Sequence, residues 1–445
     1  MEDLCSISEF DQHAFIEAHQ QAAVTSIRLN PKKKFLDDEL SSETIPWCEN
    51  GRILPKRPVF TLDPVYHAGG YYVQEASSMF LDYLLGQLLP SRSSLRVLDL
   101  CAAPGGKSTL LSSFFDTDTL IISNEVIRTR ASILEENVVR WGFANNWVTC
   151  NDAKQFSALT GYFDVIVVDA PCSGSGLFRK DKAALEEWSE ANVTLCCARQ
   201  KRIVADIWPA LKTGGILIYA TCSYSTQEDE AILDWAGESF DVSTLQVNVP
   251  ENWGIIETCS SKGHYGYRFL PDRLKGEGFF IAALQKEDLQ KALTFPKFKS
   301  ADNKKFHSIG ANFLNLTEKD LILQHKDTFV CFQNQHEVDY NLLKKHLYIR
   351  RVGTALGTPT GKDWLPAHDI AFSIARSESL PNMELSKIDA LHFLKKEEIS
   401  IIPSQKGWLL ITFQGLGLGW IKSLGNRINN YLPKHWRIRM DISEF

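Results

Sequence analysis

The sequence lacks the patterns that mark membrane proteins, disulfide scaffolds and zinc proteins. Among its 445 residues, no uninterrupted apolar run approaches the ~20 residues that a membrane span needs. Its ten cysteines include no Cys-x-x-Cys pair, which argues against both a zinc site and a disulfide framework. The acidic start, Met1–Cys5, predicts no secretory signal. We therefore expect a monomer of the reducing cytoplasm that binds neither membrane nor metal.

The chain also lacks the excess of positive charge that would indicate a nucleic-acid partner, since its net charge is −6. The distribution of charge is more informative. Residues 291–445 hold 22 Lys and Arg against 15 Asp and Glu, a net charge of +7, and residues 1–290 carry −13. A basic tail on an acidic body points weakly to an RNA or DNA surface, and a chance asymmetry of solvated faces explains it equally well.

One glycine-rich turn lacks the signatures of phosphate binding. An apolar run at Arg96–Leu100 predicts a buried strand, Ala102–Gly106 breaks it, and Lys107–Ser113 is typical of the opening of a helix. The turn lacks the first glycine of a P-loop, and its spacing is not that of a dinucleotide fold. Such a turn fits S-adenosylmethionine, which carries adenosine and no phosphate. The alternative is a tight strand–helix turn without a ligand.

Alternating strand and helix patterns around this turn predict a parallel α/β sheet. We expect strands at Arg96–Leu100, Leu120–Asn124, Trp147–Cys150, Phe163–Val168, Gly215–Ala220, Asp241–Val247 and Gly278–Leu284, and helices at Ile127–Trp141, Leu195–Leu211 and Glu228–Ala236. In such a sheet, ligands bind outside the carboxyl ends of the strands.

The length of the chain predicts two or three domains. Residues 1–68 are expected to form a small α/β extension, with a helix at Phe10–Ala23 and a strand at Thr25–Leu29, and residues 69–286 the catalytic domain. Residues 287–305 are rich in Lys, Asp and Glu and predict a linker. Residues 306–445 are expected to form a separate domain, with strands at Thr328–Phe332, Ile399–Ile402 and Trp408–Phe413 and a glycine-rich turn at Gly415–Trp420.

Three acids close three successive strands of the expected sheet. Glu125 follows the second strand and is suited to hold both hydroxyls of a ribose. Asp152 follows the third and could accept from the adenine amino group, and Asp169 follows the fourth. Any one of them alone is more often a helix cap or a solvated loop acid. Three at equivalent strand ends favour a binding pocket.

Two cysteines lie just beyond strand ends, Cys172 in Asp-Ala-Pro-Cys-Ser and Cys222 in Thr-Cys-Ser. An isolated cysteine is usually a small core residue. A reactive thiol needs a polar, partly exposed setting, and both are flanked by Ser, Thr or Gly. Methylation of carbon 5 of a pyrimidine requires such thiols, because addition of a thiolate at carbon 6 turns the poorly nucleophilic carbon 5 into a reactive one.

Four motifs in this order resemble those of the RNA cytosine-5 methyltransferases of the Nol/Nop/Sun group. They are Tyr72–Met79 (YVQEASSM), Cys101–Lys107 (CAAPGGK), Asp169–Ser173 with Gly174 and Gly176 (DAPCSGSG), and Tyr219–Ser225 (YATCSYS). Near the end of the chain, Gly417–Arg437 resembles the PUA-like tail of 16S rRNA methyltransferases of the F type. The resemblance implies a Rossmann-like methyltransferase sheet followed by a PUA-like α+β domain that binds RNA.

The resemblance also implies roles for individual residues. Cys222 would be the nucleophile, Cys172 would help to release the product, and Asp169 would also lie against the base. The residues implied to bind S-adenosylmethionine are Cys101, Ala102, Ala103, Pro104, Gly105, Gly106, Lys107, Glu125, Asp152 and Asp169. One departure is Ser108, where the family often has threonine, and the hydroxyl is kept.

The substrate expected from the resemblance is cytosine in small-subunit (16S) rRNA. The sequence lacks the Phe-x-Gly-x-Gly loop of DNA cytosine methyltransferases and the Asn-Pro-Pro-Tyr-like motif of enzymes that modify exocyclic amines. The alternatives are the same chemistry on tRNA or 23S rRNA, an RNA-binding ribosome-assembly factor whose methylation is secondary, and a small-molecule methyltransferase. We expect residues 306–445 to bind RNA, and their deletion to leave S-adenosylmethionine binding intact.

Overall fold

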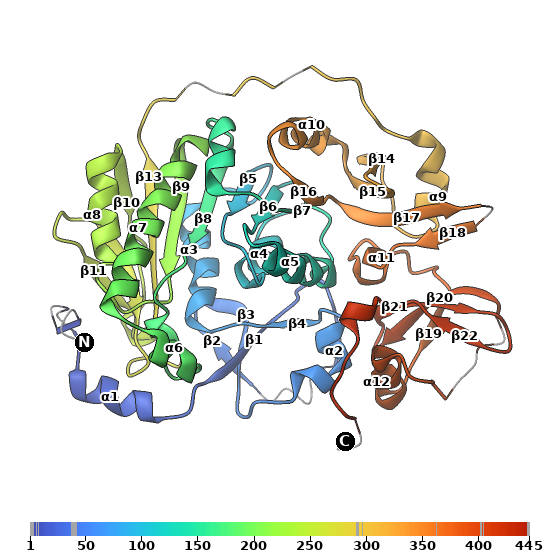
Figure 1. The fold of residues 1–445 in the computed structure, drawn as a ribbon, viewed down its shortest axis with the longest axis horizontal. Helices are drawn as coiled ribbons and strands as arrows, with labels where there is room; N and C mark the ends of the chain where they lie inside the picture. Colours follow the sequence, from blue (N-terminus) through green and yellow to red (C-terminus); the bar gives the residue numbers. More distant parts are fainter. Residues whose placement is uncertain are drawn as a thin grey trace.

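The centre of the protein is a ten-stranded mixed sheet, seen in a computed structural model of the chain (Figure 1). The structure describes all residues except 1–3, 6, 8, 37–41, 291–292, 296, 362, 401–402, 404 and 443–445. The strand order is β11-β12-β13-β9-β8-β5-β6-β7-β16, and β10 pairs with β13. The strands are β5 (Arg96–Asp99), β6 (Leu120–Asn124), β7 (Asn146–Thr149), β8 (Phe163–Asp169), β9 (Leu211–Thr221), β10 (Val242–Leu245), β11 (Ile256–Cys259), β12 (Tyr265–Phe269), β13 (Phe279–Lys286) and β16 (Ile349–Arg351).

Strands β7, β6, β5, β8 and β9 run parallel and are buried on both faces, as the apolar runs in β6, β8 and β9 predict. On one face, Val97 and Ile121 pack in one cluster with side chains of α3 and α4. On the other, Leu98 and Ile122 pack in a second cluster with α7. The helices around the sheet are α3 (Phe80–Leu88), α4 (Gly106–Phe114), α5 (Arg128–Trp141), α6 (Lys182–Glu187), α7 (Glu190–Ile207) and α8 (Glu230–Ser239). The expected α/β class is confirmed.

The N-terminal part forms a second sheet, in the order β2-β3-β1-β4. Its elements are α1 (Gln12–Gln20), β1 (Thr25–Leu29), β2 (Glu43–Ile45), β3 (Cys48–Leu54), α2 (Pro64–His67) and β4 (Tyr71–Val73). The buried Arg28 of β1 joins this sheet to the catalytic one. Its guanidinium donates to Oε1 of Gln74 at 2.8 Å and to the carbonyl of Gly106 at 3.3 Å, and it lies over the ring of Trp141. The glycine turn therefore rests on the N-terminal sheet.

The C-terminal part, orange to red in Figure 1, contains two four-stranded sheets, β14-β15-β17-β18 and β19-β20-β21-β22. Its strands are β14 (Asp320–His325), β15 (Thr328–Gln333), β17 (Thr354–Thr360), β18 (Asp363–Pro366), β19 (Asn382–Glu384), β20 (Gly407–Phe413), β21 (Leu416–Ser423) and β22 (Ile428–Asn430). Its helices are α9 (His307–Ala311), α10 (Glu337–His346), α11 (Asp369–Phe372) and α12 (Lys387–Lys395).

Two sequence-based expectations for this part are wrong. Gly415–Trp420 is not a glycine-rich turn, because only Gly415 belongs to the turn and β21 begins at Leu416. Its glycines serve close packing instead: a Cβ on Gly417 would lie 1.9 Å from the carbonyl oxygen of Ala371. Of the strand expected at Ile399–Ile402, the first two residues lie in a loop, and Ile401 and Ile402 lie outside the described residues.

The C-terminal part also contributes directly to the central sheet. Strand β16 pairs antiparallel with the outer strand β7 (Figure 1). Arg351 donates to the carbonyl of Asn146 at 2.6 Å, and Phe332 and Leu343 belong to the same hydrophobic cluster as Leu98. The two parts share one core, which argues against the expectation that residues 306–445 can be deleted without effect on the cofactor site. Across the described residues, every helix is too short or too polar to span a bilayer.

Candidate active site

The glycine turn between β5 and α4 is held by side chains of α5. Asn137 donates to the carbonyl of Pro104 at 2.8 Å, and Arg130 donates to that of Ala103 at 2.8 Å. Gly105 has φ 117°, a conformation that strongly favours glycine. A Cβ on Gly105 or Gly106 would meet its nearest atom at 3.4 Å or 3.6 Å, which is an ordinary van der Waals contact. Because both residues lack a Cβ, a nucleoside could approach the backbone of the turn closely.

Asp99, at the end of β5, is a fully buried carboxyl beneath the turn. Ser108 donates its hydroxyl to Oδ2 of Asp99 at 2.6 Å, whereas Oδ1 has no hydrogen-bond partner. Burial is the main cause that raises the pKa of Asp99 to about 7, and Asp169 adds to it. The hydroxyl kept at position 108 therefore has a structural use, which is to orient this acid.

The three acids at the strand ends are engaged in different ways. Glu125 is buried, and its Oε1 accepts the N–H of Ile127 at 2.9 Å. Asp169 pairs with Lys107, with Oδ2 and Nζ 2.7 Å apart. Asp152 is more exposed and caps the short helical segment Ala153–Ala158.

The structure brings two of these acids to the glycine turn. Charges on Asp169 and Glu125 contribute to the raised pKa of the Cys101 thiol, after burial and Asp99. That thiol is therefore held protonated beside the turn. Asp152 has Arg202 3.6 Å away, at the same edge of the sheet but on the far side of β6. Two carboxylates beside a turn of two glycines suit S-adenosylmethionine, which is cationic at its sulfonium and amino groups.

The two strand-end cysteines lie in contact, since the sulfurs of Cys172 and Cys222 are 3.2 Å apart. Their strands, β8 and β9, are parallel neighbours, and Asp169 pairs with Ala220 at the carboxyl ends. The N–H of Gly176 donates to the carbonyl of Cys222 at 2.9 Å, which ties the two loops together. The Cys222 contact and burial raise the pKa of the Cys172 thiol well above its usual range. This arrangement places a protonated thiol beside a second sulfur.

Sequence reasoning missed Glu228, which the pattern marked only as the start of a helix. The structure places its carboxylate, fully buried, against the residues that follow both cysteines. The sequence feature that could have drawn attention to Glu228 is an unusual run of three acids, Glu228–Glu230, which begins only five residues after Ser223.

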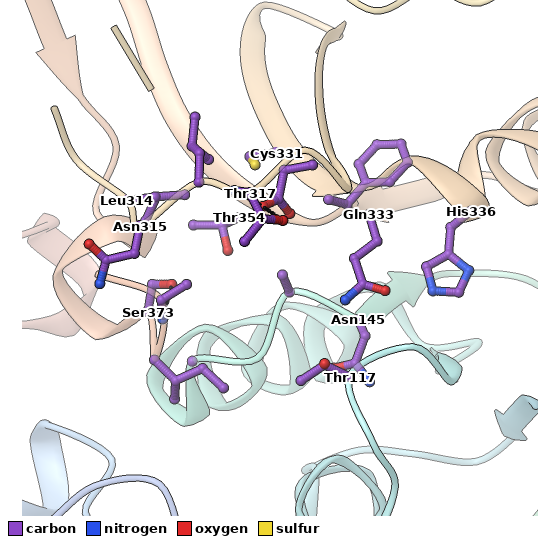
Figure 2. Close-up of a pocket in the computed structure, with 17 residues that line it drawn as sticks. Thr117, Asn145, Leu314, Asn315, Thr317, Cys331, Gln333, His336, Thr354 and Ser373 are labelled. Atoms are coloured by element: carbon purple, nitrogen blue, oxygen red, sulfur yellow. Dashed lines mark hydrogen bonds between the residues drawn. The ribbon is translucent and has the colours of Figure 1, made fainter. Parts of the chain in front are cut away.

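A separate cavity of about 200 Å³ lies between the catalytic sheet and the C-terminal part (Figure 2). It is lined on one side by Thr117 and Asn145, which precede β6 and β7, and on the other by residues such as Gln333 and His336. The amino ends of parallel strands lie opposite the edge that carries the cysteines. No residue of the expected site lines this cavity, so it is not the active site.

Comparisons with known proteins match most of the chain. The family model of the 16S rRNA methyltransferase RsmB/F matches residues 87–285, the N-terminal domain of 16S rRNA methyltransferase RsmF matches 1–76, and the methyltransferase RsmF PUA domain matches 380–438. A ribosomal RNA small subunit methyltransferase F from Shewanella loihica is 31% identical over 415 residues, covering 88% of this chain and 83% of that protein. The same enzyme from Salmonella arizonae is 30% identical, covering 97% and 94%.

Solved structures match the catalytic part. A methyltransferase homolog from Pyrococcus horikoshii is 27% identical with a TM-score of 0.54, covering 64% of this chain and 93% of that chain. NSun6 from Pyrococcus horikoshii with SFG has a TM-score of 0.52 at 18% identity, covering 62% and 94%, and supports the fold. The fold and site therefore define an S-adenosylmethionine-dependent RNA methyltransferase with a C-terminal PUA domain. The chain belongs to the 16S rRNA methyltransferase RsmB/F family.

Proposed function

We propose that the protein methylates carbon 5 of a cytosine in 16S rRNA, through a covalent bond between Cys222 and carbon 6 of the base. The observation that carries the proposal is the 3.2 Å approach of the Cys172 and Cys222 sulfurs, beside the acid Asp169 at the same strand ends. The printed names of the relatives supply the substrate class, small-subunit ribosomal RNA.

Cys222 is the attacking sulfur in this proposal. Either sulfur could donate in the contact between the two thiols. Because the Cys222 contact and burial raise the pKa of Cys172, the proposal assigns the donor role to Cys172. Cys222 is then the acceptor, the role that suits a nucleophilic thiolate. The Cys222 thiol loses its proton to solvent, and its sulfur forms the bond to carbon 6. The π bond between carbons 5 and 6 breaks, and its electron pair moves to carbon 5, which becomes nucleophilic.

S-adenosylmethionine, when bound, supplies the methyl group for carbon 5. The chain's own residues that would hold it are those of the glycine turn, Cys101–Lys107, together with Glu125, Asp152 and Asp169. Lys107 holds Asp169 through their ion pair, so that this carboxylate keeps a fixed position where the base would lie. Asp169 would stabilise the negative charge that develops in the ring by donating a proton to ring nitrogen 3 through its other oxygen, since a bare carboxylate would repel that charge.

Release of the product reverses the first step. A base removes the proton from carbon 5, the bond between carbon 6 and the Cys222 sulfur breaks, and the ring regains its aromaticity. Cys172 assists by donating its S–H hydrogen bond to the departing sulfur.

The test uses three single variants and 16S rRNA, 23S rRNA and tRNA from a strain that lacks the gene. Cys222→Ala should abolish formation of 5-methylcytosine, measured by mass spectrometry of nucleosides, and leave S-adenosylmethionine binding near normal. Cys172→Ala should accumulate protein covalently bound to 16S rRNA, seen as a shifted band on a denaturing gel. Cys259→Ala, at an exposed thiol, is the control and should act as the wild type. An active Cys222→Ala enzyme would falsify the assignment, and methylation confined to tRNA or 23S rRNA would exclude the proposed substrate.

A further inference from the structure

The carboxylate of Glu228 has no exposure to solvent, and both of its oxygens are fully used by hydrogen bonds. Its Oε1 accepts the backbone N–H of Ser173 at 2.8 Å and Nε2 of Gln200 at 3.2 Å. Its Oε2 accepts the hydroxyl groups of Ser173 at 2.5 Å and Ser223 at 2.6 Å. Gln200 also donates to the carbonyl of Pro171 at 3.1 Å. A carboxylate that accepts four bonds inside the protein has no free oxygen with which to touch a substrate.

The groups that bond to Glu228 are direct neighbours of the two thiols. Ser173 follows Cys172 in the chain, and Ser223 follows Cys222. The two loops leave different strands and are 50 residues apart in sequence. One buried side chain therefore holds the backbone next to both sulfurs.

We propose that Glu228 is a positioning residue, which sets the separation of the Cys172 and Cys222 sulfurs by fastening their two loops to one carboxylate. The expected effect on catalysis rests on the proposed function. The claim that Glu228 sets the distance between the two sulfurs rests on geometry alone. Hydrogen bonds to a charged, buried acceptor are stronger than neutral ones, and they restrict both loops to one arrangement. The buried negative charge also adds to the raised pKa of Cys172, behind the contributions of Cys222 and of burial.

Glu228 is itself held in place by the next two acids and one arginine. Asp229 accepts the hydroxyl of Thr221 at 2.6 Å and pairs with Arg268 at 2.9 Å. Arg268 also pairs with Glu230 and donates to the carbonyl of Tyr224 at 3.2 Å. The start of α8 is thus bonded to the same loop that carries Cys222. A support that is itself rigid can hold a reactive group to the tolerance that catalysis needs.

Removal of the carboxylate should change the reaction rate and not the affinity for ligands. Without Glu228, the hydroxyl groups of Ser173 and Ser223 lose their common acceptor, and the loops can separate. A shift of the thiols by about 1 Å is enough to lower kcat by ~10²-fold. Glu228 contacts none of the residues expected to hold S-adenosylmethionine, so that affinity should stay within about threefold of the wild type, less than 1 kcal/mol.

The experiment compares Glu228→Ala and Glu228→Gln with the matched control Glu337→Gln in the full-length protein. Glu337 is also a buried glutamate, 6% exposed, that accepts a serine hydroxyl and a backbone N–H, from Ser300 at 2.8 Å and Ala301 at 2.6 Å. It lies on α10, away from the cysteines. The probe is phenylarsine oxide, whose arsenic bridges two thiols that lie next to each other, and peptide mass spectrometry identifies the bridged pair.

We expect the wild type and Glu337→Gln to bridge Cys172 to Cys222 at equal rates. Glu228→Ala should bridge this pair roughly tenfold more slowly or not at all, and should lose ~10²-fold in kcat. The bridging rate and kcat of Glu228→Gln should lie between those of the wild type and of Glu228→Ala. Its amide keeps one acceptor oxygen for the N–H of Ser173, and the serine hydroxyls can turn to accept from its nitrogen. Bridging at the wild-type rate in Glu228→Ala would overturn the inference, whether or not kcat falls.

Two further measurements keep the inference testable if Glu228→Ala does not fold or if the proposed function fails. If Glu228→Ala does not fold, Ser223→Ala replaces it, since that variant removes one of the four bonds and should slow bridging severalfold; an unchanged rate would overturn the inference. If Cys222→Ala retains activity, the proposed function fails, whereas the bridging result still decides whether Glu228 sets the thiol separation.

Discussion

The backbone carbonyl of Tyr348 accepts the N–H of Cys150 at 3.1 Å and so joins the C-terminal part to the loop that ends β7. Asn151 strengthens this junction, because its Oδ1 accepts the N–H of Tyr348 at 2.8 Å and its Nδ2 donates to the Tyr348 carbonyl at 3.2 Å. The next residue is Asp152, proposed to bind the adenine. The position of that acid therefore depends on residues almost 200 positions away.

Asn151→Ala should weaken S-adenosylmethionine binding by roughly tenfold, because loss of two hydrogen bonds at about 0.5–1.5 kcal/mol each frees the loop that carries Asp152. Isothermal titration calorimetry measures the affinity. The control is Gln335→Ala, which removes a bond between the same two parts at the other end of the sheet, to the carbonyl of Asp118. Equal affinities for both variants would show that the junction does not influence the cofactor site.

Glu125→Ala should weaken S-adenosylmethionine binding by roughly 5- to 150-fold, since the loss of a buried carboxylate leaves the ribose hydroxyls underpaired at a cost of ~1–3 kcal/mol. Ser132→Ala, on the exposed side of the neighbouring helix α5, is the control. Calorimetry that finds an unchanged affinity for Glu125→Ala would argue against the pocket as proposed.

Asp99 should make the stability of the protein depend on pH. Its pKa in the folded state is about 7, above the ordinary 3.8, so the folded state favours the protonated form. Its contribution to the free energy of unfolding is therefore fully present below about pH 4 and is lost as the pH rises through 7, by up to about 4 kcal/mol.

The neutral variant Asp99→Asn lacks this contribution. The difference in unfolding free energy between the wild type and Asp99→Asn should accordingly fall between pH 4.5 and 7.5, as measured by urea denaturation at several pH values. Parallel pH curves for the two proteins would contradict the assignment.

Exposed basic residues of the PUA domain should contribute to RNA affinity through phosphate contacts. Arg427, Lys434 and Arg437 are exposed near the end of the chain. Replacing all three with alanine should weaken binding of 16S rRNA and reduce the slope of log affinity against log salt by up to about 3, with cofactor binding unchanged. Filter binding across a salt series tests this, and an unchanged slope would exclude these residues from the RNA surface.

Gly417→Ala should destabilise the C-terminal part, because the new Cβ would lie 1.9 Å from the carbonyl oxygen of Ala371 and the backbone has to shift. The expected loss is at least 1–3 kcal/mol, the usual range for overpacking. Gly86→Ala on α3 is the matched control, since the nearest atom to its Cβ would be 3.8 Å away; it should be neutral or slightly stabilising. Thermal or urea denaturation compares the two.

The parts of the fold that the sequence predicts are those with a strong local signal. Strand β6 begins and ends where expected, at Leu120 and Asn124, because its apolar run is short and clearly bounded. Strand β16 was not expected, because its three residues show no pattern and its partner β7 lies about 200 residues earlier. Pairing between strands so far apart in the sequence is decided by tertiary packing, and the local sequence shows no pattern that predicts it.

In the candidate site, too, only the features with a local signal in the sequence could be predicted. Strand ends predicted that Cys172 and Cys222 lie at one edge of the sheet, and the structure places their sulfurs in contact. The roles of the two thiols stay predictions. The run of three acids at Glu228–Glu230 marks this position as unusual, but the partners of Glu228 could not be predicted, since its hydrogen bonds join three segments of the chain in space.

The pairing of β16 with β7 also bears on how the protein avoids self-association. Without β16, β7 would be the outermost strand of this large mixed sheet, with a row of free N–H and C=O groups that any extended chain could join. The C-terminal part occupies this edge with Ile349–Arg351. A nascent chain that has not yet completed residue 351 therefore carries an open strand edge, and the last third of the sequence closes it against aggregation.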